Sequence, residues 1–256
     1  MSNAKIKLIR KLSMKKYRAE TGLFVAEGLR LCEMALNHAE IEFGLYTKTF
    51  LKTARHVELL TALEKLTTLI EISPAEFEKL SDTETPQGIL LAVHQKLSPI
   101  DEVAKKFLIV ALDGVKDPGN VGTILRTAEA FGCGVAMLDD AADIFNSKVV
   151  RSSMGAIFTL PIAKLSRENF LASMKKFGVE VTATVLDDTA EKYFCHDFTK
   201  KSAVVFGSEA DGVSAEIFNS TKKIFIPMIG TAESLNVATA AGIIIAESVR
   251  QTDCRL

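Results

Sequence analysis

The spacing of apolar residues changes near residue 97, and the two parts of the chain predict two folding units. After that point, unbroken apolar runs such as 107–112 alternate with stretches of helical periodicity such as 122–131. Unbroken runs are typical of strands buried on both faces, and their alternation with helices predicts a mostly parallel sheet with helices on both faces. We therefore predict an α/β fold for residues 98–256 and a smaller α/β unit for residues 1–97.

The predicted elements of the larger unit follow this alternation. Strands are predicted at 107–112, 134–138, 156–162, 179–185, 203–206 and 224–227, and helices at 122–131, 149–154, 168–177, 215–218 and 236–251. The last helix is apolar nearly all round, so it needs burial on most of its sides. Its small residues allow close packing against another helix, including one from a second subunit.

The smaller unit has shorter elements. Strands are predicted at 23–26, 43–47, 69–72 and 89–93, and helices at 29–37, 53–66 and directly after Ser73, with a linker over 95–100. Ser73 is a good helix N-cap, and Pro74 suits the first helical position. Residues 6–12 form an amphipathic basic segment.

Charge is unevenly distributed, although a net charge of −1 over 256 residues argues against a uniformly basic protein. The N-terminal residues Lys5, Lys7, Arg10, Lys11, Lys15, Lys16 and Arg18 all precede the first carboxylate, Glu20. Such a run attracts a polyanion through phosphate contacts and counterion release. A solvated helix end is an equally open interpretation. If the partner is RNA, the candidate contacts are Lys11, Lys15, Lys16 and Arg18.

Composition disfavours several classes of protein. With 48% hydrophobic and 25% charged residues the chain is globular, and no apolar run reaches the roughly 20 residues of a membrane helix. The N-terminus lacks the apolar segment of a signal peptide, so we expect a cytoplasmic protein. The four cysteines and four histidines are scattered without metal-ligand spacing, so we expect neither a metal site nor disulfides.

Three polar loops follow predicted strands, and the carboxyl ends of strands are where open α/β sheets bind ligands. The first loop, 117–122, is followed one helical turn later by Arg126, and the second begins at Gly207. The third separates residues 226–228 from the helix that follows Asn236. Each loop alone is also consistent with an ordinary strand-to-helix turn. The glycines of the first loop lack dinucleotide-binding spacing, which disfavours a nicotinamide-dependent dehydrogenase.

Taken in order, the three loops resemble the three motifs of the SpoU/TrmH family, within the SPOUT superfamily of RNA methyltransferases. The resemblance lies in Asn120 and Arg126 of residues 117–128, in residues 207–212, and in residues 226–228 with 233–237. The segments 15–18, 23–28 and 85–88 resemble the family's N-terminal substrate-binding domain, which is similar to a ribosomal RNA-binding protein. One departure is Ala238-Thr239, where many relatives have a serine after the valine. We expect it to change helix packing rather than chemistry.

The resemblance implies a fold and an activity. The fold is a SPOUT domain with a deep trefoil knot, and the activity is methyl transfer from S-adenosylmethionine to a ribose 2′-hydroxyl of RNA. The N-terminal domain favours ribosomal over transfer RNA. Family members are homodimers with active sites at the subunit interface, which suits the apolar last helix. The implied cofactor-binding residues are Thr184, Gly207, Glu209, Ile226, Met228, Ser234 and Leu235.

The resemblance also implies four catalytic residues, Arg126, Asn120, Glu209 and Asn236. An arginine rarely gives up its proton, so we expect Arg126 to stabilise the developing alkoxide and to hold the adjacent phosphate. Asn120 and Asn236 would position the ribose or Arg126, and Glu209 would orient Arg126. Two alternatives stay open, namely methylation of a base by the same fold and a non-catalytic RNA-binding dimer.

Overall fold

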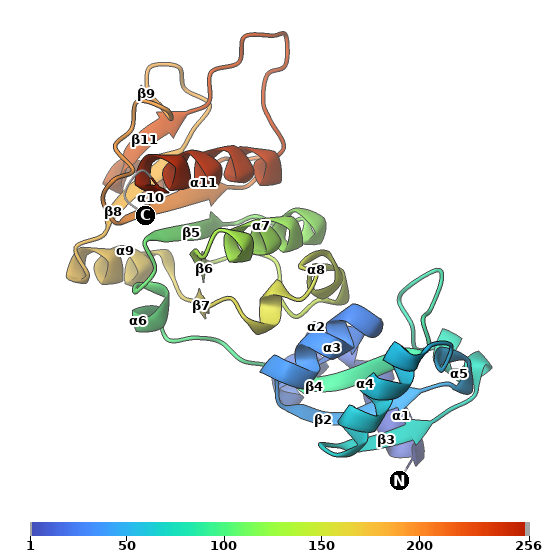
Figure 1. Ribbon diagram of the computed structural model, residues 1–256. Coiled ribbons are helices and arrows are strands. Elements are labelled where there is room, and N and C mark those ends of the chain that lie inside the picture. Colours follow the sequence, from blue (N-terminus) through green and yellow to red (C-terminus); the bar gives the residue numbers. More distant parts are fainter. Residues whose placement is uncertain (1, 254–256) are drawn as a thin grey trace. The chain divides into compact units, whose positions relative to one another are not determined.

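The structure, a computed structural model, describes residues 2–253 and forms two compact units (Figure 1). Unit 1 comprises Met1–Lys96 and Asp143–Thr159, and unit 2 comprises Leu97–Ala142 and Leu160–Leu256. The segment Asp143–Thr159 therefore leaves unit 2 and packs within unit 1. The boundary predicted at residue 97 does not anticipate this segment and stays a prediction.

Unit 1 is built on a four-stranded sheet in the order β1-β4-β2-β3. β4 is antiparallel to β1 and β2, whereas β2 and β3 are parallel. Its elements are α1 (Ser2–Leu12), α2 (Lys15–Thr21), β1 (Leu23–Glu27), α3 (Leu29–His38), β2 (Ile41–Tyr46), η1 (Lys48–Phe50), α4 (Ala54–Glu64), β3 (Thr68–Glu71), α5 (Pro74–Glu78), β4 (Ile89–His94), α8 (Ser147–Ser152) and η2 (Ala156–Phe158). Side chains from α1, α5 and the sheet, among them Ile9, Phe43 and Phe77, form one buried core.

Unit 2 contains a seven-stranded sheet in the order β7-β6-β5-β10-β8-β11-β9, and every pairing in it is parallel. Its elements are α6 (Ile100–Val103), β5 (Leu108–Asp113), α7 (Pro118–Ala130), β6 (Gly134–Met137), β7 (Ile162–Lys164), α9 (Arg167–Lys176), β8 (Glu180–Thr184), β9 (Glu191–Lys192), β10 (Ser202–Gly207), α10 (Ala215–Ser220), β11 (Lys222–Phe225) and α11 (Val237–Asp253). The predicted parallel α/β sheet is confirmed. The knot stays a prediction.

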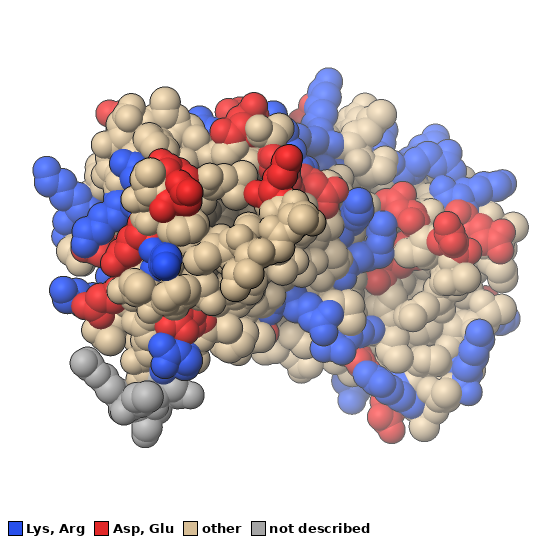
Figure 2. All heavy atoms as spheres, turned by 90° about the horizontal axis from the view of Figure 1, so that it is seen from above, with Lys and Arg blue, Asp and Glu red and all other residues tan. Residues whose placement is uncertain are grey.

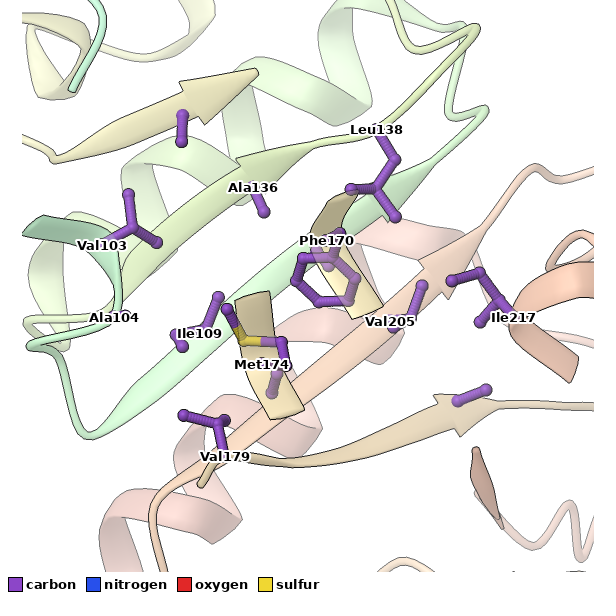
Figure 3. Close-up of a cluster of buried hydrophobic side chains, with 14 residues drawn as sticks. Val103, Ala104, Ile109, Ala136, Leu138, Phe170, Met174, Val179, Val205 and Ile217 are labelled. Carbon is purple, nitrogen blue, oxygen red and sulfur yellow. The ribbon is translucent and has the colours of Figure 1, made fainter. Parts of the chain in front are cut away.

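Helices cover both faces of the large sheet because its strands alternate two sets of buried side chains. Ile109 and Val205 point to the face that carries Phe170 and Met174 of α9, together with α6 and α10 (Figure 3). The opposite face is covered by α7 and α11, which pack against each other and the sheet (Figure 1). All strands run the same way, so the sheet has a carboxyl edge, where strands end, and an amino edge, where they begin.

Two details of the sequence prediction are wrong. The strand predicted at 156–162 is a 3-10 turn, η2, followed by a strand that begins only at Ile162. The apolar residues of that turn belong to unit 1, and Ala156 and Ile157 are buried there. The basic N-terminal segment contains a second helix, α2, which was not predicted. Among the helices of residues 2–253, none is long and apolar enough to cross a membrane.

Candidate functional site

The first loop enters α7 through a well-formed cap. The Asp117 carboxylate accepts a hydrogen bond from the Asn120 backbone at 2.8 Å, and Pro118 takes the first helical position. Aspartate at the cap and proline at this position are the residues that helix starts prefer. Gly122 and Val121 turn inward and are buried, which leaves the Asn120 side chain on the outer surface.

The second loop folds back on itself directly after β10. The backbones of Ser208 and Gly212 exchange two hydrogen bonds of 3.0 Å, and Gly212 takes a left-handed φ of +69°. A Cβ on Gly207 would lie 2.1 Å from the Gly212 carbonyl carbon, so this close approach requires glycine. The tight turn presents Glu209 at its exposed tip.

The third loop ends where Asn236 caps α11. Its side-chain oxygen accepts hydrogen bonds from the backbones of Ala238 at 2.9 Å and Thr239 at 3.3 Å. Asparagine is among the strongest N-cap residues because its oxygen satisfies N–H groups that have no partner within the helix. The cap fixes the direction of the Asn236 amide nitrogen.

A chain of side-chain hydrogen bonds joins the three loops. Asn236 Nδ2 donates to Asn120 Oδ1 at 2.9 Å, and Asn120 Nδ2 donates to Glu209 Oε1 at 2.5 Å. The Asn120 amide is therefore held at both ends, and a carboxylate terminates the chain. The structure thus brings together three of the four residues predicted to be catalytic.

The fourth residue, Arg126, lies apart from this group. It is exposed on α7, about 9 Å further along the helix axis than Asn120. Within residues 2–253 it forms no ion pair, and Glu209 contacts Asn120 instead. The predicted orientation of Arg126 by Glu209 is therefore absent from the single chain.

A cleft of about 660 Å³ opens at the carboxyl edge beside this network. Its lining includes all seven predicted cofactor-binding residues, namely Thr184, Gly207, Glu209, Ile226, Met228, Ser234 and Leu235. A volume in this range and a lining of aliphatic groups, backbone and a few polar side chains suit a nucleoside with a short aliphatic chain that ends in polar groups. The residues present therefore fit S-adenosylmethionine.

Sequence reasoning missed other residues that line the cleft, among them Leu186, Asp187 and Phe218. Asp187 follows β8 at the carboxyl edge, so the strand-end rule that found the three loops would also have found it. Hydrogen bonds from the Thr189 hydroxyl and then its backbone lower the pKa of Asp187. The sequence did not mark Leu186 and Phe218 as cleft residues, because apolar side chains are usually buried and the exposure of these two depends on how the loops fold.

A buried ion pair anchors the same edge. Asp113 at the end of β5 accepts from Arg167 Nε at 2.6 Å and from the Ser214 backbone at 2.7 Å. Burial by itself would lower the pKa of Arg167, but bonding to Asp113 outweighs it and the pKa is raised. The pair ties the starts of α9 and α10 to the strand after which the first loop begins.

The four predicted RNA contacts in unit 1 differ in accessibility. Lys11, Lys15 and Lys16 are exposed on α1 and α2. Arg18 is only 4% exposed, and its guanidinium bonds the Asp143 carboxylate and the carbonyls of Leu12 and Ser13. In this structure Arg18 therefore stabilises unit 1 and is not available to a phosphate.

Charges of both signs are mixed on the face shown in Figure 2. Across residues 2–253 there is no group of three or more His, Cys, Asp or Glu side chains that could hold a metal ion.

Comparison with known proteins gives two family matches. Residues 107–246 match the SpoU rRNA Methylase family, and residues 3–91 match the MRM3-like substrate binding domain. The chain is 34% identical over 245 residues to the 23S rRNA (guanosine(2553)-2′-O)-methyltransferase RlmP of Bacillus subtilis, with 95% of each protein covered.

Solved structures agree with these matches. An AdoMet-bound rRNA methyltransferase from Sinorhizobium meliloti aligns with a TM-score of 0.88 at 32% identity, covering 98% of this chain and 95% of that one. The SpoU methyltransferase AviRb from Streptomyces viridochromogenes, in complex with AdoMet, aligns with a TM-score of 0.87 at 28% identity, covering 97% of each chain.

Proposed function

This chain belongs to the SpoU rRNA methylase family, and we propose that it transfers a methyl group from S-adenosylmethionine to a ribose 2′-hydroxyl of ribosomal RNA. The observation that carries the proposal is the chain of hydrogen bonds from Asn236 through Asn120 to Glu209 beside the cleft. It gathers one carboxylate and two fixed amides where the three loops meet.

The cofactor supplies a methyl group that its positively charged sulfur already activates. The residues that would hold it are those that line the cleft, with Thr184 at the end of β8, Gly207 at the start of the second loop, and Met228 and Leu235 in the third loop. The remaining task of the protein is to align the ribose oxygen with the methyl group and to assist the loss of its proton.

Glu209 and Asn120 are placed to bind the ribose. Glu209 Oε2 accepts no hydrogen bond from residues 2–253, so it is available to a ribose hydroxyl. Asn120 cannot rotate freely, because both ends of its amide are engaged. A polar site fixed before the substrate arrives loses less free energy to reorganisation during the reaction.

Arg126 supplies positive charge to the developing alkoxide and the neighbouring phosphate. A guanidinium keeps its proton near neutral pH and holds two phosphate oxygens at once. Its position on α7, away from Glu209 in the same chain, supports a site shared by two subunits, in which Arg126 reaches the cleft of the partner.

We propose that the protein acts as a homodimer built on α7 and α11. On α11, Gly242, Ile243 and Val249 are only half-buried and Ala246 is exposed, so a line of apolar positions stays open in the single chain. Positions three, four and seven apart lie on one face of a helix. This open face supports a second copy packing across it.

Ribosomal RNA is favoured over transfer RNA because unit 1 matches a substrate-binding domain and presents exposed Lys11, Lys15 and Lys16. A ribosomal substrate would place the enzyme in the cytoplasm. The long connection between β11 and α11 (Figure 1) is the segment that would pass through the proposed knot.

The test of the function is the substitution Arg126→Ala. We expect methyl transfer to fall at least about a thousandfold, whereas calorimetric affinity for S-adenosylmethionine stays within about threefold of wild type, because the proposed contacts of Arg126 are with the ribose oxygen and phosphate of the RNA and not with the cofactor. RNA from a strain lacking the protein serves as substrate, and digestion locates the new methyl group.

Near-normal turnover in Arg126→Ala would show that Arg126 has no role in catalysis. A methyl group found on a base rather than on a ribose would replace the proposal by base methylation. A wild-type chain that fails to bind S-adenosylmethionine would favour a non-catalytic RNA-binding dimer.

A further inference from the structure

Paired lysines precede four neighbouring strands of the large sheet. They are Lys105-Lys106 before β5, Lys175-Lys176 before β8, Lys200-Lys201 before β10, and Lys222-Lys223 at the start of β11. The strand order β5-β10-β8-β11 makes these four starts adjacent. All four pairs therefore lie at the amino edge, opposite the cleft.

The register brings the pairs close together. The Ser202 backbone donates to Phe107 O at 3.1 Å, and the Glu180 backbone donates to Lys201 O at 3.4 Å, so β5, β10 and β8 begin level with one another. Neighbouring strands are about 4.8 Å apart, which spaces the four starts over about 14 Å. That width holds several positive charges within reach of a few nucleotides.

Neighbouring carboxylates neutralise only some of these lysines. Lys105 pairs with Glu102, Lys200 with Asp197, and Lys222 with Glu180. The other lysines of the edge form no ion pair within residues 2–253, namely Lys106, Lys175, Lys176, Lys201 and Lys223. The amino edge therefore carries an excess of positive charge.

Two further features suit a nucleic acid strand. Phe107, which follows Lys106, is 42% exposed, and an exposed aromatic residue among lysines is the arrangement on which bases stack. A groove of about 530 Å³ opens on the same edge between Lys175 and Lys222, with Val179 and Val181 among its lining. A hydrogen bond to Glu180 raises the pKa of Lys222, so it stays charged.

The carboxyl edge supplies less of this attraction, because its carboxylates outnumber its basic side chains, Lys116, Lys164 and Arg167. Its loops carry the carboxylates Asp113, Asp117, Asp139, Asp140, Asp187, Asp188, Glu209, Asp211 and Glu233. A polyanion that presents one ribose to this edge needs phosphate contacts elsewhere on the protein. Unit 1 offers one set of lysines, and the amino edge of unit 2 offers a second.

We propose that the amino edge of the seven-stranded sheet is a second RNA-binding surface. It takes a single-stranded segment of the substrate RNA, remote from the methylated nucleotide, through phosphate contacts from the lysine pairs and stacking on Phe107. The proposal rests on the proposed function for the identity of the RNA. Because phosphate groups are the same at every nucleotide, this surface increases the affinity for RNA without adding sequence selectivity.

The test compares three variants of the full chain. The edge variant replaces Lys106, Lys175, Lys176 and Lys201 by Gln, the charge-conserving variant replaces the same four by Arg, and the control replaces Lys105 and Lys200 by Gln. The probes are a labelled uridine 20-mer and 23S ribosomal RNA from a strain lacking the protein. Affinities are measured between 50 and 300 mM KCl, and thermal unfolding verifies that each variant folds.

For the edge variant we expect the slope of log affinity against log salt to flatten by about 2 to 3, since each lost single-strand phosphate contact contributes about 0.7. At 100 mM KCl the KM for 23S RNA should rise at least about tenfold, with kcat at saturating RNA and the Kd for S-adenosylmethionine unchanged. The Arg variant should retain wild-type values, and Phe107→Ala should weaken the 20-mer about tenfold.

An unchanged salt slope and KM in the edge variant would overturn the proposal, and so would an equal loss in the control, whose lysines are already paired. The proposal would also be overturned if the edge variant kept its affinity for RNA but lost binding to an acidic protein, because the surface would then bind protein rather than RNA. If the wild-type chain bound RNA but transferred no methyl group, the proposed function would fail. The salt dependence of 20-mer binding would still test whether this surface binds RNA.

Discussion

The two edges of the large sheet carry opposite charge and hold it in different ways. At the carboxyl edge, Asp113 is buried against Arg167, Asp117 caps α7, and Glu209 bonds Asn120. At the amino edge, lysines such as Lys175 and Lys176 are exposed, and five of the eight form no ion pair within the part of the chain that the structure describes. One edge ties its charges into the fold, whereas the other leaves them in solvent.

The difference reflects what each edge has to do. Methyl transfer depends on the geometry of a few atoms, so its polar groups need partners that fix them before the substrate arrives. Phosphate attraction depends mainly on charge density and tolerates mobile side chains. Single substitutions test this difference between the edges.

The largest effect is expected for Asp113→Ala. The change leaves Arg167 without its main partner and the Ser214 backbone without an acceptor. Removing one member of a buried pair is costly, so the free energy of unfolding should fall by about 3 kcal/mol, measured by urea denaturation. The matched control is Asp140→Asn, which removes the charge of an exposed carboxylate 3.5 Å from the same arginine. Asparagine tolerates the left-handed φ of +63° at this position, so the change should cost less than about 0.5 kcal/mol.

Equal, small losses in Asp113→Ala and Asp140→Asn would erase the distinction between the edges, because the carboxyl edge would then hold its charges as loosely as the amino edge.

The next effect is expected for Glu209→Gln, which keeps an oxygen for Asn120 but loses the negative charge. Turnover should fall about a hundredfold, about 2.7 kcal/mol in activation free energy, with the salt slope of RNA binding unchanged. Mixing this chain with Arg126→Ala tests the shared site as well. Half of the dimers would be mixed and one of their two sites intact, so about one quarter of wild-type activity should return.

A mixture that stays inactive would show that Arg126 serves the cleft of its own chain. Each variant measured alone supplies the background rate.

The smallest effect separates the two tasks of Asn236. Asn236→Ala should lower the free energy of unfolding by about 1 kcal/mol, because it removes the α11 cap. Asn236→Ser should restore most of that stability, since serine is also a good N-cap. Both variants should lose methyl transfer to the same extent, because alanine has no donor and the serine hydroxyl is too short to reach Asn120 as the Asn236 amide nitrogen does. A serine variant with wild-type turnover would show that Asn236 acts only as a cap.

Sequence reasoning located the carboxyl edge because strands buried on both faces are easily recognised and ligand loops follow their ends. The resemblance to the SpoU/TrmH family then selected Asn120, Glu209 and Asn236 on these loops. Sequence reasoning could not predict that they bond in that order, because each partner lies about a hundred residues away in the chain. It also expected Glu209 to reach Arg126, which depends on helix geometry that local patterns do not contain.

Other features depended on tertiary packing. Arg18 lies in a basic segment and belongs to a residue type that often contacts phosphate. Only its pairing with Asp143, 125 residues away, shows that it is structural. The apolar residues 156–162 have the pattern of one strand, but their first half packs in unit 1. The lysine pairs are visible in the sequence, but strand order was needed to place them on one edge.

The segment Asp143–Thr159 has a consequence for exchanging parts between relatives. Within unit 1, Phe145 packs against Phe24 with ring centroids 5.0 Å apart, and Val149 and Val150 are fully buried. A chain cut at residue 97 would keep this segment but lose the sheet that covers it, exposing an apolar surface that favours aggregation. Recombination that transplants the substrate-binding unit must therefore carry both pieces of it, so the unit is inherited as an interrupted module rather than as a detachable N-terminal block.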